Sequence, residues 1–319
     1  MNADFLDTQL MAYLRLREAL GFQMRAEKSL LPEFVAYVQA NHNGCVIRAQ
    51  MALEWACQAS TRQGASGAAR RLSMARGFLS YLKASCPDTE VPGPGLLPTP
   101  RRPTPYLFTP AEITTLLKAA QASRPRGALR PHTLACLLGL LASTGLRVGE
   151  AMRLQSAQGK LALDPPQLHI LETKFHTSRI VPLHLTTAEH LRSYHEQRTR
   201  VHSEGVSAAF FVSEQGQHLQ HRALHDWFAR LCQRVAITPT DGGRQPCLTS
   251  FRHTFAVTRM QRWYEQGLDV QALLPHLSVY LGHIHPQESY WYLTAVPELL
   301  SAAAHRFETF AHAGGTRHA

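Results

Sequence analysis

Apolar residues recur at helical spacing through the first 82 residues of the chain. Leu6, Leu10, Tyr13 and Leu14 form one such stripe, which is typical of a helix that packs one face on a core. The same spacing predicts helices over residues 6–20, 30–38, 47–58 and 65–82. Residues 1–85 are therefore expected to fold as a small helical domain.

Seven prolines interrupt this pattern between residues 86 and 105. Proline lacks a backbone N–H and cannot continue a helix, so residues 86–105 are expected to form an extended linker between two domains. Arg101 and Arg102 lie within this segment and are candidate contacts to a polyanion.

Residues 106–319 combine helical and alternating patterns. Alternation over residues 167–185 predicts a hairpin, and residues 208–219 predict a further strand and turn. Thr109, Pro110 and Glu112 form a typical helix start. Helical spacing predicts the remaining elements, at residues 109–123, 131–145, 222–235, 250–267 and 297–313. The expected fold class is mainly α with small β-hairpins, an α+β domain.

The charge of the chain narrows the class of partner. The formal net charge is +10 and the isoelectric point is about 9.6, which favours a polyanion, and nucleic acid over a membrane. The candidate DNA contacts in and just before the fourth expected helix are Arg62, Arg70, Arg71 and Arg76. For any one of these arginines, a solvated basic face is the alternative interpretation.

Cysteine usage and the N-terminus indicate the compartment. Six cysteines are scattered without a C-x-x-C pair, so neither a zinc site nor a disulfide framework is expected, and a reducing compartment is favoured. The first ten residues do not have the pattern of a signal peptide, and the longest apolar run, from Leu134, is too short to span a bilayer. A cytoplasmic protein without membrane contact is expected.

Four segments of the second domain carry cationic or proton-transferring side chains. Arg147 follows a glycine at an expected helix start, and Glu150, three residues on, is placed to hold its guanidinium. Arginines can bind two phosphodiester oxygens, a lysine or histidine can protonate a leaving oxygen, and a tyrosine can act as a nucleophile. This chemistry needs no metal or nucleotide cofactor, and His283 and His285 lack further ligands at metal spacing. The other candidate residues for it are Lys174, Arg252, His253 and His283.

Four motifs in this order, "TGLRVGE", "TK…SRIVPL", "SFRHTFA" and "LGHIHPQESYWYL", resemble the tyrosine recombinase (phage-type integrase) family. The resemblance covers the chain from Pro105 to about Leu300. In that family the nucleophilic tyrosine stands nine residues after the histidine of Leu-Gly-His, which selects Tyr292. In a helix, residues 290 and 292 point about 200° apart, so both cannot face one phosphate. Tyr290 and Trp291 are expected to pack around the nucleophile.

The resemblance also implies roles for residues. Tyr292 would attack the scissile phosphate and form a 3′-phosphotyrosyl link, with Lys174 as the general acid. Arg147, Arg252 and His283 would stabilise the charged transition state. Arg179, in the second motif, is a further candidate DNA contact. The implied partner is double-stranded DNA, bound by a homotetramer on two sites or together with a partner recombinase, and the C-terminal helix would dock on a neighbouring subunit.

One position departs from the family pattern, which usually has histidine three residues before the arginine of the third motif. Here that position is Thr249, whose hydroxyl can hydrogen-bond a phosphate but cannot transfer a proton near neutral pH. His253 and His176 are the candidate substitutes. The alternatives to a recombinase are a non-catalytic DNA-binding relative and a type IB topoisomerase that relaxes DNA without joining two sites.

Overall fold

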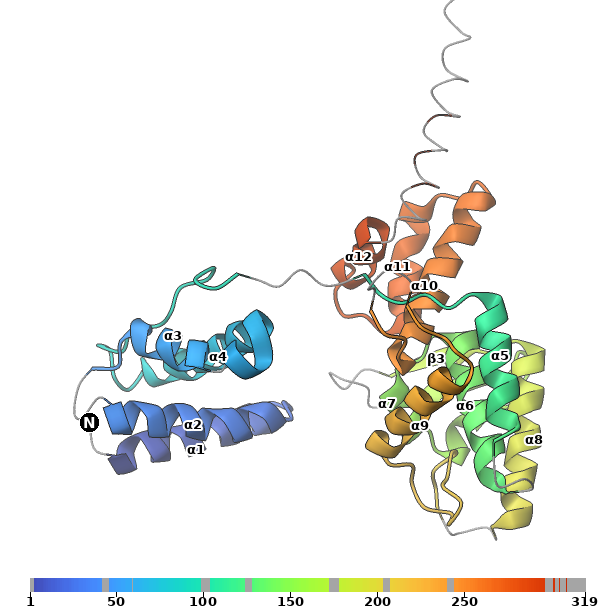
Figure 1. Ribbon diagram of the computed structural model, residues 1–319, viewed down its shortest axis with the longest axis horizontal. Coiled ribbons are helices and arrows are strands. Elements are labelled where there is room, and N and C mark those ends of the chain that lie inside the picture. The colour runs from blue at the N-terminus through green and yellow to red at the C-terminus, as the bar shows by residue number, and fades with distance from the viewer. Residues whose placement is uncertain are drawn as a thin grey trace, which may run out of the picture. The chain divides into compact units, whose positions relative to one another are not determined.

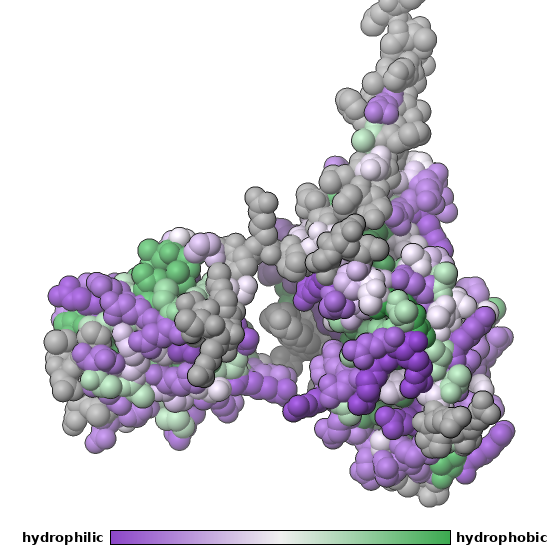
Figure 2. Space-filling model, in the orientation of Figure 1, coloured by the Kyte–Doolittle hydropathy of each residue, from purple (hydrophilic) through white to green (hydrophobic). Residues whose placement is uncertain are grey.

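The computed structural model describes residues 3–41, 46–58, 60–98, 104–123, 128–171, 178–202, 207–239 and 244–295, together with residues 301, 304 and 308. The chain divides into two compact units, Met1–Arg102 and Pro103–Ala319 (Figure 1). Each unit has its own hydrophobic core. Hydrophilic side chains cover much of the visible face of each unit, and the first unit also carries a hydrophobic patch there (Figure 2).

The described residues of the first unit form four helices, as the apolar spacing predicts. They are α1 (Ala3–Ala19), α2 (Arg25–Asn41), α3 (Ala49–Gln58) and α4 (Ser60–Leu82). Their apolar stripes meet in one core, where the rings of Phe34 and Trp55 lie 5.1 Å apart and those of Tyr13 and Phe78 lie 5.7 Å apart.

The first part of the proline-rich segment packs on this helical unit instead of spanning open space. The backbone N–H of Glu90 donates to the carbonyl of Ile47 at 2.9 Å. The Arg76 guanidinium donates to the carbonyls of Pro92 and Gly93, at 2.8 Å each. The carbonyls of this segment thus serve as acceptors that tie its first part to the helical unit, and the linker over residues 86–105 stays a prediction. Arg101 and Arg102 lie outside the described residues.

Helices form most of the second unit. Its first helix, α5 (Pro110–Gln121), begins at the predicted Thr109–Glu112 capping box. Helix α6 (Leu129–Thr144) is buried around most of its circumference and packs against α5, α7, α8 and α10. The other helices are α7 (Val148–Arg153), α8 (Leu185–Val201), α9 (His221–Arg234), α10 (Leu248–Glu265), α11 (Val270–Leu281) and α12 (Gln287–Ala295), with a short 3₁₀ helix at Ser156–Gln158.

A small antiparallel sheet lies beside these helices, with strands in the order β1 (Gly159–Lys160), β2 (Gln167–Ile170) and β3 (Arg179–Pro182). Strands β2 and β3 form the predicted hairpin, with Leu168 opposite Val181. Both of these side chains are fully buried, which fixes the pairing register. The hairpin therefore brings the start of β3 to the carboxyl end of β2.

Several elements differ from the sequence predictions. Helices α8 and α11 and strand β1 were not predicted. Residues 208–219 form isolated bridges, Gln155 with Ala209 and Val212 with His218, instead of a regular strand. The predicted helix at residues 297–313 lies almost wholly outside the described residues. In the described part of the chain, no helix is both long and apolar enough to cross a membrane.

Candidate active site

Two glycine turns create the framework of the site. Gly145 ends α6 with φ of 64°, and Gly282 ends α11 with φ of 70°. Residues other than glycine rarely adopt this left-handed backbone conformation. Each turn stops a helix and is followed within two residues by a charged or titratable side chain, Arg147 at the start of α7 and His283 after α11.

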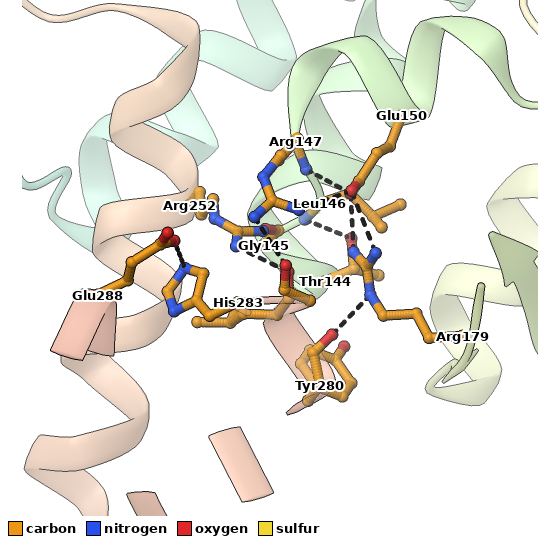
Figure 3. Close-up of polar contacts among 12 residues, drawn as sticks. Thr144, Gly145, Leu146, Arg147, Glu150, Arg179, Arg252, Tyr280, His283 and Glu288 are labelled. Atoms are coloured by element: carbon orange, nitrogen blue, oxygen red, sulfur yellow. Dashed lines mark hydrogen bonds and ion pairs between the residues drawn. The ribbon is translucent and has the colours of Figure 1, made fainter. Parts of the chain in front are cut away.

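Two arginines join these turns to each other. Arg252, on α10, donates to the carbonyl of Gly145 at 3.0 Å and to that of Leu281 at 2.7 Å. Arg147 donates from Nη2 to the carbonyl of Gly282 at 2.8 Å. The two guanidinium groups are thereby held close together by backbone acceptors, which carry no net charge (Figure 3).

A single carboxylate, that of Glu150, holds Arg147 from the other side. Glu150 Oε1 accepts from Arg147 Nη1 at 3.0 Å, and Oε2 accepts from the backbone N–H of Arg147 at 3.0 Å. The predicted pairing of Glu150 with Arg147 is confirmed. Burial alone would raise the pKa of the Glu150 carboxyl, but hydrogen bonds and charge from Arg179 and Arg147 bring it below its ordinary value.

Arg179, at the start of β3, is the second partner of this carboxylate. It donates to Glu150 Oε1 at 3.1 Å and Oε2 at 2.7 Å, and its Nε donates to the carbonyl of Tyr280 at 2.8 Å (Figure 3). Its side chain is only 10% exposed. These partners hold Arg179 inside the protein, where it connects β3, α7 and α11. The expected contact of Arg179 with DNA stays a prediction.

The site carries excess positive charge. The guanidinium groups of Arg147, Arg179 and Arg252 surround one carboxylate, so three positive charges less one negative charge leave +2. Burial lowers the pKa of Arg252 to about 10, and repulsion from Arg147 adds to this effect, while Tyr292 and Glu150 oppose it. Two uncompensated positive charges, with Arg252 buried and Arg147 partly exposed, are a favourable binding place for an anion with several oxygens, such as a phosphodiester.

His283 is held at the start of α12. Its Nδ1 lies 2.7 Å from Ser289 Oγ. Its Nε2 lies 3.8 Å from Glu288 Oε2 (Figure 3). Ser289 is fully buried and also accepts from Ser278 Oγ at 2.8 Å. This serine orients the histidine ring, and no sequence signal singled it out.

Tyr292 and Tyr290 lie on opposite sides of α12, as the helical angle predicts. Tyr292 is 1% exposed, and its hydroxyl lies 3.0 Å from His253 Nδ1. Tyr290 is 43% exposed, so the expectation that it packs around the nucleophile is wrong. Trp291 does pack there, with its ring 5.2 Å from that of Tyr292 and 5.9 Å from that of His253.

Comparisons with known proteins identify the family. The sequence profile of the phage integrase family matches residues 107–297. The protein named "Putative integrase/recombinase y4rB" from Sinorhizobium fredii (strain NBRC 101917 / NGR234) is 39% identical over 302 residues, which cover 93% of this chain and 95% of that protein. The chain belongs to the phage integrase family. It is thus a tyrosine recombinase, an enzyme class that performs site-specific DNA recombination.

Other relatives of this integrase-family chain agree in sequence or in fold. Tyrosine recombinase XerC from Chlamydia caviae is 28% identical over 219 residues, 66% of this chain and 64% of that protein. The structure of XerH site-specific recombinase bound to palindromic difH substrate, a post-cleavage complex, matches with TM-score 0.66 and 17% identity over 86% of this chain and 77% of that chain. The Tn1549 transposon integrase in complex with transposon right end DNA matches with TM-score 0.64 and 14% identity over 93% and 98%. At these identities the structural matches show the fold.

The remaining predicted site residues of this integrase-family chain fall into two groups. Thr249 is exposed in the first turn of α10, three and four residues before Arg252 and His253, and so lies on the same helix face as both. Lys174 and His176 lie outside the described residues, as does the side chain of Arg62. Within the described part of the chain, no cluster of three or more His, Cys, Asp or Glu could hold a metal ion.

The arginines of the first unit do not form one exposed face. Arg70 is exposed, and Arg76 binds the carbonyls of Pro92 and Gly93. Arg71 is buried, with its guanidinium 3.9 Å from the centroid of the Trp55 ring and 3.3 Å from Glu33 Oε2. The expected exposed position is therefore wrong for Arg71, because side chains of α2 and α3 cover it.

Proposed function

We propose that this recombinase cleaves and rejoins double-stranded DNA through a 3′-phosphotyrosyl intermediate on Tyr292. The observation that carries the proposal is the convergence of Arg147 and Arg252 on adjacent backbone carbonyls, with the Tyr292 hydroxyl 3.0 Å from His253, the residue after Arg252. Guanidinium groups held in place before the substrate arrives stabilise charge that develops on the phosphate oxygens, and need no reorganisation during the reaction.

The proposed cleavage step conserves the phosphodiester bond energy. The Tyr292 oxygen attacks phosphorus, the bond to the 5′ oxygen breaks, and the leaving oxygen takes a proton from Lys174 as general acid. Arg147, Arg252 and His283 bind the non-bridging oxygens. Because the product is a phosphotyrosyl ester, the 5′-hydroxyl of a second strand can attack it and restore a DNA backbone bond without a cofactor.

The proposed partners follow from this chemistry and from the structural relatives. The lambda integrase structure with TM-score 0.61 and 14% identity is a dimer bound to a core site, and the XerH structure is bound to difH substrate. We propose that this chain also binds double-stranded DNA and exchanges strands as a homotetramer on two sites, in the cytoplasm, alone or with a partner recombinase. Its net charge of +10 is consistent with DNA binding.

A nicked suicide substrate tests the covalent step. The nick lets the released strand diffuse away, so the protein–DNA adduct accumulates and survives denaturation in SDS. We expect the wild-type chain and the matched control Tyr290→Phe to form the adduct, and Tyr292→Phe to form none. An adduct in the Tyr292→Phe protein would overturn the assignment. Relaxation of a plasmid without a recombination site would instead indicate a topoisomerase.

A further inference from the structure

The described part of the site places one histidine directly on the proposed nucleophile. His253 Nδ1 lies 3.0 Å from the Tyr292 hydroxyl oxygen, whereas His283 Nδ1 lies 2.7 Å from Ser289 Oγ. We propose that His253 is the proton acceptor for Tyr292 and takes the place of the histidine that the family usually has at position 249. This inference rests on the proposed phosphotyrosyl function.

Several contacts hold the His253 ring in this position. The residue is buried in α10, and its ring lies 5.6 Å from that of Tyr292 and 5.9 Å from that of Trp291. The preceding residue, Arg252, is fixed by two backbone carbonyls. One turn of α10 therefore carries both the anchored guanidinium and the group that contacts the nucleophile, and no other segment has to move to bring them together.

The contact is chemically suited to general base catalysis. The ordinary pKa of a tyrosine hydroxyl is about 10, so at neutral pH its proton must leave as the oxygen attacks phosphorus. A neutral histidine with its proton on Nε2 presents Nδ1 as an acceptor. Thr249 has no group that could accept a proton near neutral pH, and it is exposed.

The proton balance of the step is complete. During cleavage, the O–H bond of Tyr292 breaks and its proton passes to His253 Nδ1. The bond between the tyrosine oxygen and phosphorus forms, the bond between phosphorus and the 5′ oxygen breaks, and Lys174 gives that oxygen a proton. During rejoining, His253 returns its proton to the tyrosine oxygen as the phosphotyrosyl bond breaks, while Lys174 recovers its proton from the attacking 5′-hydroxyl.

The same hydrogen bond has a different possible role, as a latch that keeps Tyr292 away from DNA. The two roles predict opposite signs. Loss of a proton acceptor slows cleavage, whereas loss of a latch speeds it. The choice of variant matters, because a substitution that also removes packing would confuse the two roles. His253→Asn keeps a polar group near the position of Nδ1 but cannot accept a proton.

The test is single-turnover cleavage of two suicide substrates. One is ordinary DNA, and in the other sulfur replaces the 5′ bridging oxygen, so the leaving thiolate needs no proton. We expect His253→Asn to cleave about 10²–10⁴-fold more slowly than wild type on both substrates. Lys174→Ala should be slow on the oxygen substrate and recover on the sulfur substrate. His276→Asn, an exposed histidine on α11, is the matched control and should cleave like wild type.

Three results would overturn the inference. They are wild-type cleavage by His253→Asn, faster cleavage that reveals a latch, and recovery of His253→Asn on the sulfur substrate, which would place His253 at the leaving oxygen. DNA affinity and the thermal midpoint show whether the variant is folded, and His253→Gln is measured in its place if it is not. Failure of the proposed function is seen separately, as an adduct that persists in Tyr292→Phe.

Discussion

Three arginines in each unit of this recombinase are arranged in opposite ways. In the second unit Arg147, Arg179 and Arg252 converge around Glu150 and two glycine turns. In the first unit Arg71 is covered by Trp55, Arg76 binds carbonyls of the proline-rich segment, and Arg70 is exposed. Convergence leaves uncompensated positive charge for a substrate, whereas Arg71 and Arg76 of the first unit are bound by local partners.

The two sets of arginines differ in arrangement because of the backbone around them, and not because of the number of charges. In the second unit, helices α6 and α11 both end in left-handed glycine turns, and their free carbonyls point at the guanidinium groups. Neutral acceptors hold an arginine in place without cancelling its charge. In the first unit, Arg71 meets a carboxylate and an aromatic face, both of which stabilise its charge where it is. A basic helix is therefore weak evidence for a catalytic or DNA-binding role of any single arginine.

The largest effect should follow from breaking the converged set at Arg252. Lysine keeps the charge but replaces a planar fork by one ammonium group, which cannot bind both carbonyls and the phosphate. We expect Arg252→Lys to slow single-turnover cleavage by about 10²–10³-fold, as for loss of one fixed donor to a transition-state oxyanion. Arg71→Lys is the matched control in the other unit and should cleave at the wild-type rate. Equal slowing of both variants would contradict the contrast between the two sets.

Only the local part of this arrangement could be predicted from the sequence. The Arg147–Glu150 pair follows from a spacing of three residues, and the choice of Tyr292 over Tyr290 agrees with helix geometry. The partners of Arg252 lie 107 and 29 residues away along the chain, and no periodicity predicts such contacts. The same limit explains the error at Arg71, whose covering residues lie on other helices.

Secondary structure shows the same limit. Most helices with apolar stripes and the β2–β3 hairpin were predicted, since local periodicity specifies them, although the apolar helix α11 was not. Helix α8 was missed because most of its residues are polar, although Ala188, Leu191 and Tyr194 recur every three residues and mark its buried face. The folding of residues 86–98 onto the first unit could not be read locally, because it depends on carbonyl acceptors and a distant arginine.

A variant of Arg179 tests whether a residue can support the positions of Arg147 and Arg252 without contacting DNA. Glutamine at this position leaves the whole charge of Glu150 to Arg147, which should draw Arg147 away from the phosphate. We expect Arg179→Gln to slow cleavage by a smaller factor than Arg252→Lys does. In the double variant Arg179→Gln/Glu150→Gln, part of the cleavage rate should return. The salt dependence of DNA binding should stay unchanged. A slope that flattens by about 0.9 would instead indicate a direct phosphate contact.

The glycine turns can be tested with a matched pair. A Cβ added at Gly282 would lie 2.7 Å from Arg179 Nη1 and 3.4 Å from Arg147 Nη1. Gly267 has a similar φ of 71°, but a Cβ added there would meet no atom within 4 Å. Both alanine variants should lose about 1–3 kcal/mol of stability from backbone strain. Only Gly282→Ala should also slow cleavage, because its Cβ would displace Arg179. Arg179 binds Glu150 and the Tyr280 carbonyl, so its displacement disturbs the carboxylate that holds Arg147. Thermal unfolding and single-turnover cleavage separate the two effects, and equal cleavage by both variants would argue against the turn as a support of the site.

In the first unit, Arg70 and Arg71 should respond in opposite ways. Arg71→Ala removes a buried stacking and ion-pair contact, and we expect it to cost about 1–2 kcal/mol in the stability of this unit, measured by hydrogen exchange in α4. Arg70→Ala should leave that stability unchanged. If Arg70 lies on DNA, its removal should flatten the salt dependence of binding by about 0.9. A flatter slope for Arg71→Ala with no loss of stability would reverse the assignment.

The smallest effect is expected at Thr249, where this chain departs from its family. Thr249 is exposed on the same face of α10 as Arg252 and His253, so a histidine should fit there without strain. If His253 already accepts the proton of Tyr292, a second histidine adds no new step, and Thr249→His and Thr249→Ala should both cleave close to the wild-type rate. Single-turnover cleavage across pH, with circular dichroism as the folding control, checks this. If Thr249→His gains about 10²-fold or more, position 249 is where a positioned acid–base group acts, and His253 serves only to hold the tyrosine.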